Sequence, residues 1–162
     1  MSGLLDAVLR ERRAQTDPAS PDADLRGRTY AIPFDTVWKA ATGIVNAGVR
    51  GWSLIRSDDR AGTIVGLVQP GPMSKHADLL VTIGLDAMAQ TRVDFSATSR
   101  TERGDLGRSR RILLRFFRLL DERLGAGPEQ ILDPASLNAL ASSVVEPPPV
   151  ATPPESTERS AS

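Results

Sequence analysis

The spacing of apolar residues along the chain predicts helices at its start and strands in its middle. Four apolar residues between positions 4 and 9 recur at helical spacing, which predicts a short amphipathic helix over residues 3–14. This helix could dock on its own domain, on a partner or on a membrane. The first two alternatives, or simple fraying, are favoured because the helix is short and mixed in charge. The polar stretch of residues 16–27, with two prolines, is typical of a linker.

The middle of the chain shows one helical pattern followed by four strand-like segments. "TYAIP" predicts a short strand, and residues 35–48 then place Val37, Ala41 and Ile44 on one helical face. The strand-like segments are "GWSLIRS", "TIVGLVQP", "DLLVTIGLD" and "TRVDFSATSR". Because their connections are short and rich in turn residues, they are predicted to form an antiparallel meander.

A long helix and a polar tail complete the pattern. Leucines and phenylalanines form one broad stripe over residues 105–124, and a weaker helix is predicted over 134–145. The final segment "EPPPVATPPESTERSAS" is too rich in proline and small polar residues to form a packed core, so disorder is expected. The predicted organisation is an N-terminal helix and linker (1–27), an α+β domain (28–127), a short C-terminal helix (128–145) and a disordered tail (146–162).

The predicted element order of the domain is β-α-β-β-β-β-α. An α+β fold, with an antiparallel sheet and both main helices on one face, is the simplest way to bury both helical stripes. In that arrangement the inner face of the last strand must meet the long helix. Phe95 is therefore expected to pack against Phe116 and Leu120.

Composition narrows the classes of function. The chain has 20 basic and 20 acidic side chains, so no global field recruits nucleic acid or an acidic membrane surface. It has no cysteine, which excludes thiol chemistry, and its single histidine, His76, excludes a metal site that needs two imidazoles. No cofactor or metal is expected. No apolar run is long enough to span a bilayer, and a cytoplasmic location is the default expectation.

The segment "TRVDFSATSRTERGDLGRSRRILLRFFRLLD" resembles the signature of an uncharacterised bacterial family, the domain of unknown function numbered fourteen-ninety-nine. The matching positions are Thr91–Asp94, Ser99, Arg100, Arg103, Asp105, Leu106, Gly107, Arg111 and Ile112. The resemblance extends loosely over residues 28–124. Glu102 and Ser109 depart from it, since glycine and asparagine are usual at those positions. Because the family has no assigned activity, the resemblance implies a fold and no function.

Within that segment, "SRTERGDLGRSRR" contains five arginines, two acids and two glycines. One hypothesis is an anion site, for phosphate or carboxylate, at the start of the long helix. Its candidate residues are Arg100, Arg103, Asp105, Gly107, Arg108 and Arg111. The other hypothesis is structural: Asp105 caps the helix, and Arg100 or Arg103 pairs with Asp105, Asp94 or Asp86. The structural interpretation is favoured, because a capping carboxylate competes directly with an external anion.

Other candidate residues have plain structural explanations. Asp58 and Asp59 lie in a predicted turn, and Trp38 and Trp52 are expected to pack in the core. The predicted function is a small binding or interaction module without catalytic activity, whose partner is a protein or a small anion. Two alternatives stay open: a small hydrolase or isomerase that uses carboxylates and His76, and a carrier of an apolar ligand in a cavity under the long helix.

Overall fold

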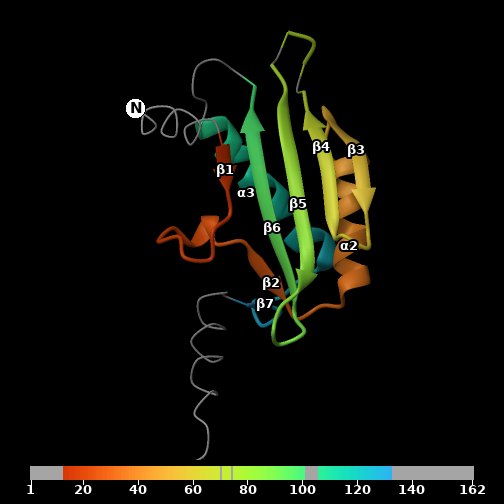
Figure 1. The fold of residues 1–162 in the computed structure, drawn as a ribbon, viewed down its shortest axis with the longest axis vertical. Helices are drawn as coiled ribbons and strands as arrows, with labels where there is room; N and C mark the ends of the chain where they lie inside the picture. The colour runs from red at the N-terminus through yellow and green to blue at the C-terminus, as the bar shows by residue number, and fades with distance from the viewer. Residues whose placement is uncertain (1–12, 70, 74, 101–105, 133–162) are drawn as a thin grey trace, which may run out of the picture.

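The computed structural model describes residues 13–69, 71–73, 75–100 and 106–132, which form a sheet with two helices on one face (Figure 1). This architecture confirms the predicted α+β class and the predicted meander of four strands. The elements are β1 (Arg13–Gln15), η1 (Ala23–Leu25), β2 (Arg28–Tyr30), α2 (Phe34–Gly43), η2 (Ile44–Gly48), β3 (Trp52–Asp58), β4 (Thr63–Val68), β5 (Ala77–Leu85), β6 (Thr91–Ser99), α3 (Leu106–Leu124) and β7 (Ile131–Leu132).

The strands lie in the order β3-β4-β5-β6-β2-β7, with β1 also paired to β6, and every pairing is antiparallel. The β5–β6 ladder extends from Ala77 opposite Ser99 to Leu85 opposite Thr91. The alternation of β6 turns Val93, Phe95 and Ala97 toward the helices. Its even-numbered residues therefore lie on the open face.

The segment before β2 contributes a strand to the sheet. The sequence predicted instead that this segment holds the end of a helix and a linker. Residues 13–15 form β1, and Ala14 lies opposite Ala97 of β6. The buried Thr16 continues the contact, because its N–H donates to the Phe95 carbonyl and its hydroxyl accepts from the Phe95 N–H, both at 2.9 Å. Without these partners, the backbone groups of β6 that face residues 13–16 would be left unpaired.

The core lies between the sheet and the helices. The ring centroids of Phe95 and Phe116 are 4.8 Å apart, and Phe117 lies 5.4 Å from Phe116. Leu120 is fully buried beside them. The predicted packing of the last strand on the long helix is thereby confirmed.

Gly66 of β4 allows the helical layer to approach the sheet closely. A Cβ atom at this position would lie 2.6 Å from Cγ1 of Val45 and 2.9 Å from Cδ1 of Leu79. The space above this strand glycine is therefore filled by the domain's own side chains. The strand pairing shifts by one residue directly opposite, between Leu54 and Arg56, so β3 has a bulge where it faces this glycine.

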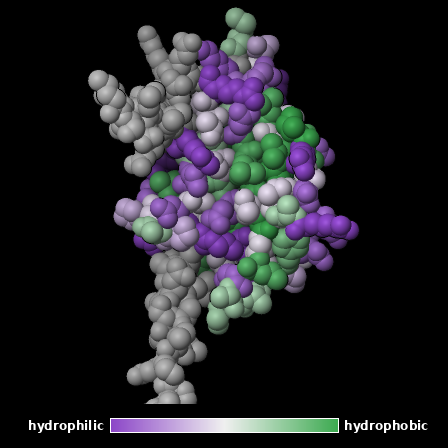
Figure 2. Space-filling view, viewed as in Figure 1, coloured by the Kyte–Doolittle hydropathy of each residue, from purple (hydrophilic) through white to green (hydrophobic). Residues whose placement is uncertain are grey.

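The other face of the sheet is not covered by a described element (Figure 1). Hydrophobic residues gather on it over β4 and β5, and polar residues lie over β1 and β6 (Figure 2). Val65 and Leu67 are half-buried there, and Leu80 is exposed. No helix within the described ranges is long and apolar enough to cross a membrane.

At the carboxyl end, residues 131–132 form β7, which pairs with β2. The sequence instead predicted that these residues belong to a short C-terminal segment (128–145) with a helix. The predicted helix over 134–145 and the predicted disordered tail lie outside the described residues, as do the first twelve residues.

Candidate functional site

The described arginines of the segment "SRTERGDLGRSRR" do not gather at one site. Arg100 donates two hydrogen bonds to the carboxylate of Asp78, at 2.7 and 2.6 Å. The predicted partners Asp94 and Asp86 were therefore wrong for Arg100, whereas the predicted partner Asp105 lies outside the described residues. The strand register explains why Asp78 is the partner. Asp78 lies opposite Thr98 on the open face of the sheet, and Arg100 is two residues after Thr98.

Two of the predicted residues, Arg103 and Asp105, lie outside the described residues, so the capping role of Asp105 stays a prediction. Gly107 is exposed, and a Cβ atom there would meet nothing within 4 Å. It does not line a described hollow.

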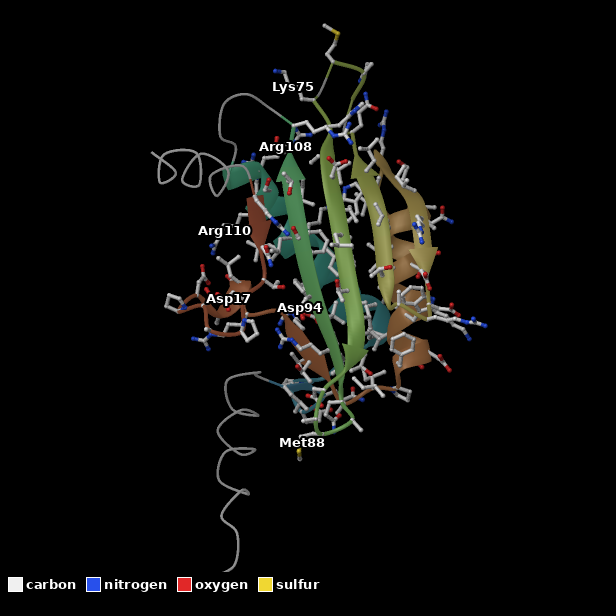
Figure 3. The ribbon with its side chains drawn as sticks, viewed as in Figure 1. Asp17, Lys75, Met88, Asp94, Arg108 and Arg110 are labelled. Carbon is white, nitrogen blue, oxygen red and sulfur yellow. The ribbon has the colours of Figure 1, made fainter. Side chains whose placement is uncertain are left out.

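Arg108 and Arg111 both line a hollow that we name the arginine pocket. Its volume is about 320 Å³. The lining residues are Arg50, Trp52, Val68, Arg108, Arg111, Ile112 and Arg115. Figure 3 shows Arg108 beside the end of β6, at the end of the sheet from which α3 begins.

The helical side of the pocket follows from spacing along α3. Arg108, Arg111 and Arg115 are three and then four residues apart, so they share one face of the helix over roughly 10 Å. Ile112 lies between them and is buried at 7% exposure. The helix therefore supplies a row of guanidinium groups beside an apolar floor.

The opposite side of the pocket comes from the ends of β3 and β4. Trp52, the first residue of β3, pairs with Val68, the last residue of β4. Arg50 precedes this pair, and the backbone N–H of Gln69 holds the junction by donating to the Gly51 carbonyl at 2.7 Å. Trp52 is 8% exposed, as expected for a core residue, and it also forms part of the pocket wall.

The described lining of the pocket contains no aspartate or glutamate. Arg50, Arg111 and Arg115 are exposed and form no ion pair with any acid that the structure describes. Guanidinium groups gathered in this way repel one another and attract an anion, which each can bind through two parallel N–H donors.

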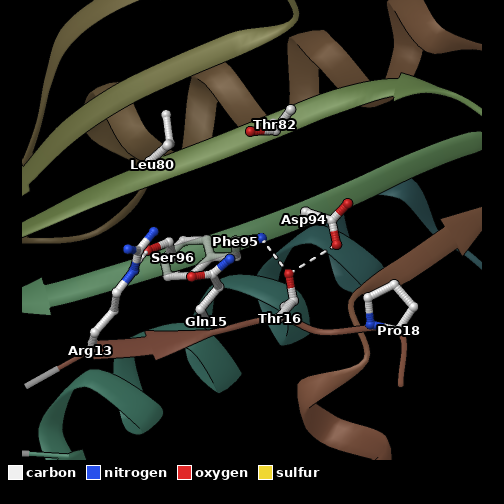
Figure 4. Close-up of a pocket in the computed structure, with 9 residues that line it drawn as sticks. All are labelled: Arg13, Gln15, Thr16, Pro18, Leu80, Thr82, Asp94, Phe95 and Ser96. Atoms are coloured by element: carbon white, nitrogen blue, oxygen red, sulfur yellow. Dashed lines mark hydrogen bonds between the residues drawn. The ribbon is translucent and has the colours of Figure 1, made fainter. Parts of the chain in front are cut away.

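A second hollow, also about 320 Å³, lies on the open face of the sheet beside β1 (Figure 4). Several of its polar groups already bind other residues of the domain. Asp94 accepts hydrogen bonds from Thr16 at 2.9 Å and from Arg92 at 2.7 Å, and Arg13 donates to Ser96 at 3.0 Å. These contacts attach β1 to β6, so we assign this hollow a structural role.

The residues considered for catalysis are dispersed. His76 lines neither of these two hollows. Asp58 accepts the backbone N–H of Ala61 at 3.1 Å within its own turn, as predicted for this acidic pair. In the described part of the chain, no group of three histidines, cysteines or acids could hold a metal ion.

No protein-family model and no curated protein matches the chain, so the family resemblance noted in the sequence stays a prediction.

Sequence reasoning found two of the four pocket arginines and missed Arg50 and Arg115. The spacing of Arg108, Arg111 and Arg115 on one helical face was a usable signal for the last of these. Nothing local in the sequence pointed to Arg50, because it reaches the site only through the pairing of β3 with β4.

Proposed function

We propose that this domain is a small non-catalytic binding module that holds a phosphate or carboxylate group in the arginine pocket. The observation that carries the proposal is the convergence of four arginines, from two distant parts of the chain, on one hollow of about 320 Å³. Arginine is suited to such anions because its planar fork matches their oxygen atoms.

The chemistry of the lining supports binding over catalysis. Guanidinium groups stay protonated in proteins, so they position and neutralise an anion but do not exchange protons with it. Among the described residues, the lining offers no carboxylate, imidazole or hydroxyl group as a base or nucleophile. The apolar floor of Trp52, Val68 and Ile112 favours an organic anion whose body contacts these side chains.

The test is binding of inorganic phosphate and phenyl phosphate, measured by calorimetry and by the shift in melting temperature. We expect both anions to raise the melting temperature, and phenyl phosphate to bind more tightly because its ring contacts the apolar floor. Replacing Arg111→Gln together with Arg115→Gln should weaken binding at least about tenfold, since each removes a charge-assisted contact. Arg56→Gln is the matched control, because Arg56 is exposed on β3 outside the pocket.

Sodium chloride at equal ionic strength provides the second control. A melting temperature that responds to chloride as it does to phosphate would contradict the proposal. Equal weakening by Arg56→Gln and by the pocket substitutions would also contradict it.

A further inference from the structure

The arginine pocket lies at the same end of the sheet as the loop that joins β4 to β5. Val68 both ends β4 and lines the pocket, and the loop follows directly, with residues 69, 71–73, 75 and 76 described. At the far side of the loop, the backbone N–H of Arg100 donates to the His76 carbonyl at 3.0 Å, so the residue that follows β6 lies there too.

This loop carries an exposed apolar side chain. Met73 is 96% exposed, more than any other large hydrophobic residue that the structure describes. Lys75, two residues later, is also exposed. A single exposed hydrophobic residue is common on protein surfaces. Its significance here comes from its place in the loop that carries Lys75 and follows the pocket residue Val68.

Basic side chains gather at one end of the sheet, although the net charge of the chain is zero. This basic end has Lys75 and the arginine pocket, and a described acid at this end, Asp78, is held by Arg100 at 2.6 Å. The turns at the opposite end contain Asp58, Asp59 and Asp86 together with Arg60. Figure 3 shows Lys75 and Arg108 at one end of the sheet and Met88 at the other.

We propose that the basic end docks on a membrane surface that contains anionic phospholipids. The inference rests on the proposed function, since the arginine pocket would surround the phosphate of a lipid headgroup. Met73 would enter the boundary between headgroups and acyl chains, and Lys75 would remain at headgroup level. The turns that contain Asp58, Asp59 and Asp86 would then face away from the negative surface.

A membrane accounts for features that a dissolved phosphate leaves unexplained. Met73 and Lys75 lie outside the lining of the pocket, so a small anion bound within it gains nothing from them. A planar anionic surface contacts the pocket and the loop tip together. Charge complementarity supports this partner, because basic residues near such a surface each favour binding.

The test is sedimentation of the full chain with vesicles of phosphatidylcholine alone or of phosphatidylcholine mixed with phosphatidylglycerol. We expect binding to the mixed vesicles only, with a loss of roughly fivefold in the partition coefficient for each of Arg50→Gln and Arg115→Gln. Met73→Ser should also weaken binding several-fold. Met88→Ser is the matched control, because Met88 is 56% exposed in the turn at the opposite end of the sheet.

The variants separate the failure of this inference from that of the proposed function. Met73→Ser should bind inorganic phosphate as the wild type does, since Met73 lies outside the pocket. Phosphate binding without vesicle binding would overturn the membrane inference alone, and the absence of both would overturn the proposed function as well. Equal vesicle binding by Met73→Ser and Met88→Ser variants would show that the basic end is not the docking surface.

Discussion

Arginines in two regions of this domain differ in what surrounds them. The paired arginines have carboxylate partners within the domain: Arg28 with Asp121 at 3.3 Å, Arg92 with Asp94 at 2.7 Å and Arg110 with Asp22 at 2.6 Å. The exposed arginines of the arginine pocket form no ion pair with an acid in the described ranges. The same residue type therefore cross-links the fold in one region and is available to an external anion in the other.

The paired arginines join segments that are far apart in the chain. Arg110 and Asp22 are separated by 88 positions, and their contact connects η1 to α3. Arg92 also donates to the backbone carbonyl of Arg26 at 2.9 Å, which holds the chain between η1 and β2 against β6. The abundance of arginine in a sequence is thus a poor guide to function unless the partners are known.

Of the substitutions that test this comparison, Asp121→Ala is expected to cause the largest loss of unfolding free energy. Asp121 accepts a hydrogen bond from the hydroxyl of the fully buried Tyr30 at 2.6 Å and also contacts Arg28. Its removal leaves a buried hydroxyl and a half-buried guanidinium unsatisfied, so unfolding free energy should fall by about 2–3 kcal/mol. Urea denaturation measures the change. The neighbouring Glu122→Ala, at an exposed position, serves as control, and a loss below about 1 kcal/mol for Asp121→Ala would show that this pair does not stabilise the fold.

A smaller, pH-dependent effect is expected from Arg110→Gln. Hydrogen bonding from Arg110 is the main cause that lowers the pKa of the Asp22 carboxyl below its usual range. A lowered pKa in the folded state means that the stabilisation is present above the unfolded pKa, about 4, and is lost as pH falls through the folded value. The variant should melt at most a few degrees below the wild type at neutral pH, and the gap should close below pH about 4. A gap that stays constant down to pH about 2 would contradict this origin.

The smallest effect on stability is expected in the arginine pocket itself. Arg50→Gln with Arg115→Gln removes two exposed charges that have no described acidic partner, so unfolding free energy should change by no more than about 0.5 kcal/mol. Any change should be toward higher stability, because like charges are removed. Denaturation without added phosphate measures it. A loss of unfolding free energy as large as that of Asp121→Ala would show that these arginines stabilise the fold as the paired arginines do, and it would contradict the comparison.

Strand β1 shows where local prediction failed. Residues 13–15 follow a helical apolar pattern and show no strand alternation long enough to recognise. They form a strand because β6 has an open edge above β2, and the backbone groups of that edge require partners. Thr16 completes the edge through its own backbone and side chain, which no pattern around residue 16 announces.

The sequence by itself determined the α+β class, the four-strand meander and the buried faces of β6 and α3, because the periodicity of a strand or helix is a local property of the chain. It also determined that Arg108 and Arg111 share a helical face. Only the tertiary structure decided that Arg50 and Trp52 lie opposite them, that Arg100 pairs with Asp78, and that Lys75 and Arg108 lie at the same end of the sheet. These contacts depend on strand register and on how α3 crosses the sheet, and neither is encoded by the residues around any one position.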